Sequence, residues 1–182
     1  MIVLETLFFV APLYAANSCA VLSKFVPILK NWTTPVDFGL SLKGERILGK
    51  GKTFRGLLFG VACGIAISYL QYCIAPHIIL SNMSFYNGAS FQKIILLGFL
   101  LSSGGLLGDM VKSFFKRRVG IKSGRPWPVF DQLDFIVGGL LVASLVYTPP
   151  LPAIILLVFG TPVIHFLSNI SAYLLHLKDV WW

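Results

Sequence analysis

Five long apolar stretches limit how this chain can fold. A helix needs about 20 apolar residues to cross the ~30 Å hydrocarbon core of a bilayer, and backbone groups in lipid must be paired within the spanning element. The stretches that approach or exceed this length are residues 4–26, 54–79, 90–115, 131–147 and 151–177. Only 12% of the residues are charged, against roughly 25% in soluble domains. The sequence therefore predicts an all-α integral membrane protein, a bundle of about five transmembrane helices forming one domain over residues 1–182.

The basic residues predict how this bundle is oriented. Fourteen of the 15 Lys and Arg residues lie within residues 24–55, within residues 112–125 or at Lys178 after the fifth stretch, and only Lys93 lies near the other side. Because cytoplasmic loops are enriched in Lys and Arg, we expect two basic cytoplasmic loops. With five spans, the N-terminus is then outside and the C-terminus cytoplasmic, in a multi-pass protein of the cell membrane.

The segment from Gly108 to Phe135 departs from its apolar surroundings, since it carries three aspartates among six basic residues. Carboxylates close to membrane depth usually mark a functional site. Helical spacing places Asp109, Lys112, Ser113 and Lys116 on one face of the third stretch.

Asp131 and Asp134 share a face at the start of the fourth stretch. Neighbouring carboxylates repel each other unless a cation lies between them, and Mg²⁺ prefers carboxylate oxygens. Asp109, Asp131 and Asp134 are therefore predicted to bind one or two Mg²⁺ ions. Helix capping by Asp131 and a favourable helix dipole at Asp134 are the structural alternatives, but they leave Asp109 unexplained.

The basic residues between these acids suit a polyphosphate, because Lys offers point charge and Arg can bind phosphate through two donors. An ordinary positive-inside loop is the simpler alternative. In the first basic loop, Gly49–Gly56 reads GKGKTFRG. It does not match a P-loop, since Arg46 stands where glycine is required and no strand is expected before it. Lys52, Thr53 and Arg55 remain candidate phosphate ligands at a helix start, with contact to lipid headgroups as the alternative.

Polar residues also interrupt the apolar stretches, namely Asn17 in the first and His165, Asn169 and His176 in the fifth. Hydrogen bonding between helices is the favoured explanation, and the roles of the three residues in the fifth stretch stay open.

The motif Ser113-x-x-Lys116-Arg117, with Lys122 five residues on and then Asp131-x-x-Asp134, resembles the signature of CDP-diacylglycerol synthases; Asp109 lies in a preceding Gly-Asp. Ser123 and Gln132 depart from the usual Asp and Arg, and the linker is shorter. Together with YAAN at residues 14–17 and the GKGKTFRG loop, these departures resemble the archaeal branch of the family, the CDP-archaeol synthases.

The resemblance implies a reaction. In this family CTP and an unsaturated archaeal ether-lipid phosphate, 2,3-di-O-geranylgeranylglyceryl phosphate, give CDP-archaeol and pyrophosphate with Mg²⁺. The residues expected to act in catalysis are Asp109, Asp131, Asp134 and Lys122. Those expected to bind the nucleotide or the lipid phosphate are Lys52, Thr53, Arg55, Lys112, Ser113, Lys116, Arg117 and Lys122.

The expected partners are CTP, the lipid phosphate and membrane lipids, with no nucleic acid, and a homo-oligomer is allowed for. A CTP-dependent polyprenol kinase and a small ion-coupled transporter are the alternatives. The residues alone leave open the lipid linkage, its tail saturation and the number of metal ions.

Overall fold

The computed structural model describes residues 1–78 and 83–174, and most of this part of the chain is helical. The helices are α1 (Ile2–Leu22), α2 (Phe54–Ile74), α3 (Phe91–Arg118), α4 (Phe130–Ala143) and α5 (Leu151–Leu174). Short 3-10 turns cover Ser23–Phe25, Ala75–His77 and Ser84–Tyr86, and a two-stranded antiparallel hairpin is formed by β1 (Ser41–Leu42) and β2 (Glu45–Arg46). The predicted all-α membrane bundle is confirmed.

Four of these helices, α1, α2, α3 and α5, are long and apolar enough to cross a membrane. The fourth apolar stretch is shorter than expected, because α4 has 14 residues and so a length of about 21 Å. It ends at Ala143 in a tightened turn, where the N–H groups of Leu145 and Val146 donate to carbonyls three residues earlier. Pro149 and Pro150 then follow, and the residue before a proline is disfavoured in a helix.

Other helix ends also differ from the expected spans. α3 continues to Arg118, three residues past the expected end at 115, and its last turn carries three cations that suit the negative end of a helix dipole. α2 ends at Ile74, ahead of Pro76. The expected end of the fifth stretch, residues 175–177, lies outside the described residues, as do His176 and the side chain of His165.

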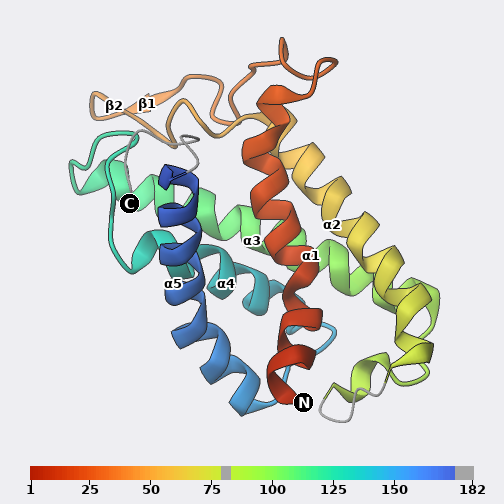
Figure 1. The fold of residues 1–182 in the computed structure, drawn as a ribbon. Coiled ribbons are helices and arrows are strands. Elements are labelled where there is room, and N and C mark those ends of the chain that lie inside the picture. Colours follow the sequence, from red (N-terminus) through yellow and green to blue (C-terminus); the bar gives the residue numbers. More distant parts are fainter. Residues whose placement is uncertain (79–82, 175–182) are drawn as a thin grey trace.

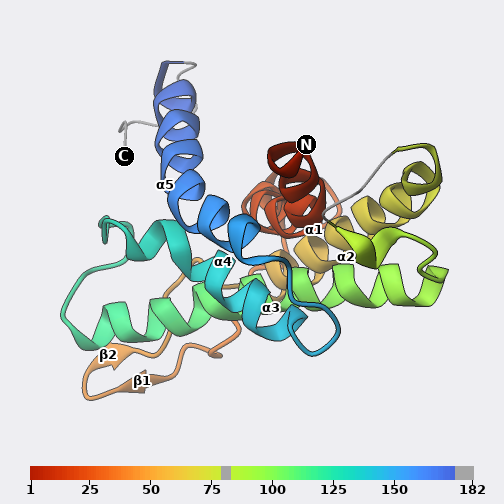
Figure 2. The same ribbon diagram turned by 90° about the horizontal axis from the view of Figure 1, so that it is seen from below.

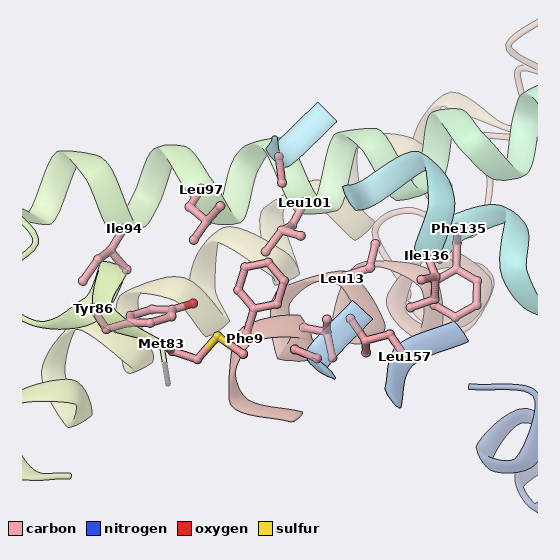
Figure 3. Close-up of a cluster of buried hydrophobic side chains, with 13 residues drawn as sticks. Phe9, Leu13, Met83, Tyr86, Ile94, Leu97, Leu101, Phe135, Ile136 and Leu157 are labelled. Carbon is pink, nitrogen blue, oxygen red and sulfur yellow. The ribbon is translucent and has the colours of Figure 1, made fainter. Parts of the chain in front are cut away.

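α1 lies at the centre of the bundle and contacts each of the other four helices. The N-terminal end of α1 and the β1–β2 hairpin lie at opposite ends of the molecule (Figure 1), while the view from below shows α3 running beside α4 (Figure 2). The core forms around α1, with Phe9 and Leu13 packed among side chains of α3, α4 and α5 (Figure 3).

Both basic loops meet at the same end of the bundle. Arg118, at the end of α3, donates to the carbonyl oxygens of Leu42 at 2.6 Å, Glu45 at 3.2 Å and Arg46 at 2.8 Å. The first loop is thereby tied to the start of the second.

Candidate active site

Close packing of α3 against α4 brings charged residues of the Gly108–Phe135 segment together in space. A Cβ added at Gly108 would collide with the backbone carbonyl of Asp134, and one added at Gly138 would collide with the carbonyl of Gly104. The two backbones therefore approach as closely as only glycine allows. As a result, Asp134 lies beside the polar face of α3.

The ammonium group of Lys112 lies among all three aspartates. Its Nζ is 3.3 Å from Oδ1 of Asp109, 2.6 Å from Oδ1 of Asp131 and 2.9 Å from Oδ2 of Asp134. The Lys112 side chain is only 13% exposed, so this cation compensates carboxylates that would otherwise repel one another. The predicted clustering of these three acids is thus present, and a lysine lies at its centre.

Asp131 is held by further donors. Lys116 donates to both of its carboxylate oxygens, at 3.0 and 2.8 Å, and the backbone N–H of Trp127 donates at 2.6 Å. The bond from Trp127 links the carboxylate to the 119–129 loop. Val129, at the start of α4, adopts a positive φ of 69°, which is uncommon for a β-branched residue. The backbone is therefore strained where the loop delivers Asp131 to the site.

The first basic loop contributes Lys52, which donates to Oδ2 of Asp109. The neighbouring candidates have other partners. Thr53 caps α2 by accepting from the N–H of Gly56 at 3.3 Å, and Arg55 donates to the carbonyl of Lys30 at 2.6 Å. Arg55 therefore holds the loop together, whereas Lys52 reaches the acidic cluster.

A polar cavity of about 170 Å³ opens between the two basic loops and α3. Its lining contains no carboxylate and four cationic side chains, those of Lys52, Lys112, Lys116 and Arg117. The other lining residues are Leu48, Gly49, Gly51, Ser113, Ser123 and Gly124. Arg117 is 8% exposed, and among the described residues its Nε has no hydrogen-bond partner. Buried, cationic and incompletely paired groups of this kind favour an anion such as a polyphosphate.

Lys122 does not line this cavity, although Ser123 and Gly124 do. Its side chain is exposed. Of the residues predicted to bind phosphate, the structure therefore gathers five around this cavity, namely Lys52, Lys112, Ser113, Lys116 and Arg117. The other three, Thr53, Arg55 and Lys122, do not line it.

An apolar groove of about 610 Å³ runs between α3 and α4 and reaches the same cluster. Its walls include Val111, Phe115, Val137 and Leu141, and its lining also contains Lys112 and Asp134. Trp127 and Phe130 stack at 4.4 Å between ring centroids beside it. Lys112 thus lines both the cationic cavity and the apolar groove, so the two spaces meet at one side chain.

Two residues of this region were not among the predicted site residues. Asn17 of α1 lines a cavity of about 80 Å³ with Lys52 and Asp109, and its only sequence signal is a polar residue inside an apolar run. Asp37 is a buried acid of the first basic loop. An isolated acid in a long loop carries no periodicity that would have singled it out.

Hard oxygen ligands are present in the cluster, but they surround an ammonium group. Within residues 1–78 and 83–174, the structure has no group of three or more His, Cys, Asp or Glu side chains arranged to hold a metal ion. The donor set nevertheless suits Mg²⁺, since three carboxylates converge on one cation. Mg²⁺ binding stays a prediction.

Comparison with known proteins places these features in a family. All of residues 1–182 match the family model described as "CarS-like: CDP-archaeol synthase". The CDP-archaeol synthase of Methanocaldococcus jannaschii is 39% identical over 178 residues, 97% of this chain and 96% of that protein. That of Archaeoglobus fulgidus is 40% identical over 187 residues, 100% of this chain and 98% of its own length.

A solved structure is also similar. It is described as "an intramembrane enzyme for archaeal membrane lipids biosynthesis", with a TM-score of 0.72 and 34% identity over 92% of this chain and 94% of that one.

Proposed function

The chain belongs to the CDP-archaeol synthase family, and from this premise we propose that it transfers CMP from CTP to 2,3-di-O-geranylgeranylglyceryl phosphate at the junction of the two cavities. The family makes the protein a cytidylyltransferase of the membrane. The assignment of lipid, metal and membrane side is our proposal. The proposed place of the reaction rests mainly on one observation, that Lys112 lines both a cationic polar cavity and an apolar groove.

The reaction needs two substrates of opposite character at one point. The CTP triphosphate fits the cationic cavity, where Lys52, Lys116 and Arg117 neutralise its charge. The lipid tails fit the apolar groove, which leaves their phosphate at Lys112. A phosphate oxygen of the lipid then attacks the α-phosphorus of CTP, and the bond from that phosphorus to the oxygen bridging it to the β-phosphorus breaks to release pyrophosphate.

No protein nucleophile is required, because the attacking lipid phosphate is already ionised at neutral pH. The residues act by placing the two phosphates side by side and by neutralising their mutual repulsion. Lys112 and Lys116 are held for this by the aspartates, as their ion pairs fix the two ammonium groups on one face of α3.

Asp109, Asp131 and Asp134 would hold Mg²⁺, which when bound supplies charge neutralisation at the phosphates. Because Lys112 already contacts these three carboxylates, the ammonium group and the metal compete for the same oxygens. Replacing Lys112 by Met should therefore increase the rise in unfolding temperature that MgCl₂ produces. The matched control is Lys50→Met, which removes an exposed lysine of the first loop. Equal shifts in all three proteins would contradict the metal assignment.

The decisive experiment uses purified protein with CTP labelled at the α-phosphorus, MgCl₂, and one of three lipid phosphates. These are the geranylgeranyl ether lipid, its saturated ether analogue and an ester-linked phosphatidic acid. We expect label in the lipid fraction, release of pyrophosphate, and the highest kcat/KM with the unsaturated ether lipid. Release of CDP with no α-label in lipid would instead identify a kinase.

We further propose that the active site faces the cytoplasm, since both basic loops lie at one end of the bundle and cytoplasmic loops are rich in Lys and Arg. In a cysteine-free background, Lys50→Cys should react with a membrane-impermeant maleimide only after the cells are opened. Ser90→Cys, at the start of α3, should react in intact cells. The reverse pattern would overturn the orientation.

A further inference from the structure

Asp37 has a carboxylate that is almost completely buried within the first basic loop. Its side chain is 1% exposed, although ionised carboxylates are rarely buried without full compensation. Oδ1 accepts from the N–H of Gly39 at 3.0 Å and from the guanidinium of Arg46 at 2.7 Å. Oδ2 accepts from the N–H groups of Leu48 at 3.0 Å and Gly49 at 3.4 Å.

Gly39, Leu48 and Gly49 lie on either side of the β1–β2 hairpin and Arg46 lies in β2, so the carboxylate closes the loop at the base of the hairpin. Burial alone disfavours the charge, but the hydrogen bonds from Leu48, Gly39 and Arg46 outweigh it and lower the pKa of Asp37. Asp37 is therefore ionised at neutral pH. Gly49 adopts a φ of +122°, a conformation that side chains rarely allow, so the chain turns sharply at the residue that Asp37 holds.

The segment beyond this turn leads directly to the site. The N–H of Lys52 donates to the carbonyl of Gly49 at 3.2 Å, and the Lys52 carbonyl accepts from the N–H of Val36 at 2.8 Å. The side chain of Lys52 then contacts Asp109. Gly49 and Lys52 both line the cationic cavity. A continuous series of hydrogen bonds thus connects Asp37 to the acidic cluster, although Asp37 lines neither the cavity nor the groove.

We propose that Asp37 is a positioning residue for cytidylyl transfer, which acts through Gly49 and Lys52 to hold one wall of the nucleotide cavity in place. It contacts no substrate. This role rests on the proposed assignment of the cationic cavity to CTP. It predicts that losing Asp37 weakens the use of CTP selectively and leaves the use of the lipid phosphate intact.

The test is a double-mutant cycle between Asp37 and Lys52. Asp37→Asn keeps the volume of the side chain but turns an amide NH₂ toward backbone N–H donors, and Asp37→Ala removes all acceptors. We expect either variant to lower kcat/KM for CTP by about 10- to 100-fold, since displaced positioning groups have effects of that order. KM for the lipid phosphate should remain within about threefold of the wild type, because Asp37 lies away from the groove and distant sites affect one another little.

Lys52→Met should lower kcat/KM for CTP by itself, and adding Asp37→Asn should then cost little more, because the residue through which Asp37 acts has already been lost. The matched control is Glu45→Gln, which removes an exposed carboxylate from the same hairpin and should behave as the wild type. If turnover of Lys52→Met is too slow to measure, titration calorimetry of CTP binding to the four proteins of the cycle supplies the same coupling.

A merely structural role gives a different result. The effects of Asp37→Asn and Lys52→Met would then multiply, or the kinetic constants for both substrates would fall together with the folded fraction measured by thermal unfolding. Either outcome would overturn the positioning role. Failure of the wild type to label lipid from α-labelled CTP would instead overturn the proposed function, so the two failures are distinguishable.

Discussion

The contacts of α1 with α2 and of α3 with α4 both depend on glycine, yet they surround different chemistry. In the first pair, a Cβ at Gly60 would lie 2.6 Å from the carbonyl oxygen of Ala16, and one at Gly56 would lie 3.1 Å from that of Ala20. In the second pair, Gly108 and Gly138 meet the facing backbone in the same way. The same packing device therefore operates twice in one bundle.

The difference lies in what stands next to the glycines. Gly108 directly precedes Asp109, and Gly138 lies one helical turn after Asp134, so close approach of α3 and α4 also brings carboxylates and Lys112 together. At Gly60, by contrast, the α1–α2 contact has only apolar neighbours, Ala16, Ala20 and Leu106. The charge cluster therefore forms at the glycine contact of α3 with α4 and not at Gly60.

Removing a carboxylate from the α3–α4 contact should have the largest effect on kcat. Asp131→Asn or Asp134→Asn should lower kcat by at least about 10²- to 10³-fold, the loss typical of removing a preorganised electrostatic group. Label transfer from CTP to lipid measures the loss, and membrane insertion with cooperative thermal unfolding shows that the variants fold. Near-normal turnover of both variants in the presence of Mg²⁺ would contradict the assignment.

Adding one methyl group to each glycine contact compares the two pairs directly. Gly108→Ala pushes α4 away from α3 and should lower kcat on the order of 10²-fold, since a shift of about 1 Å in reacting groups has that effect. Gly60→Ala creates a similar collision away from the charges and should destabilise the protein by about 1–3 kcal/mol with less than about threefold loss in kcat. Equal loss of kcat in the two variants would show that the site depends on the bundle as a whole.

Filling the apolar groove should affect only one substrate. Val137→Trp places a large side chain in the groove and should raise KM for the lipid phosphate by about 10- to 100-fold, because overpacking costs about 1–3 kcal/mol. KM for CTP should not change. Leu58→Trp, at an exposed position of α2, is the matched control, and a rise in KM for CTP as well would argue against a lipid-binding groove.

The smallest effect is expected at Lys122. The sequence motif predicts a catalytic, phosphate-binding lysine here, but its side chain is exposed and does not line the cationic cavity. Lys122→Gln should therefore raise KM for CTP by only about two- to threefold, as exposed charges contribute roughly 0–1 kcal/mol, and the difference should diminish at high salt. A loss as large as that of Asp131→Asn would restore Lys122 to the site.

Much of the fold was predictable because membrane spans are recorded in local composition. Long apolar runs identified all five helices, and helical spacing placed Asp109, Lys112 and Lys116 on one face of α3. The length of α4 was predicted incorrectly, because hydropathy continues past Ala143 while the backbone tightens before the prolines.

The site was predictable only in part. Sequence spacing could not show that Arg55 binds loop carbonyls or that Lys52 crosses to Asp109, since these contacts join residues far apart in the chain. It gave no reason to select Asp37, and for Asn17 it gave only the signal of a polar residue inside an apolar run. The positions of these residues depend on how separate parts of the chain fold against one another, which no periodic pattern encodes.

The sequence by itself thus determined a multi-span membrane protein with acids and cations on defined helix faces, because hydropathy and helical period are local properties. The tertiary structure decided that Lys112 lies among three aspartates and that a polar cavity meets an apolar groove beside it. The physical reason is the backbone contact at Gly108 and Gly138, since the distance between two helices follows from how their surfaces pack.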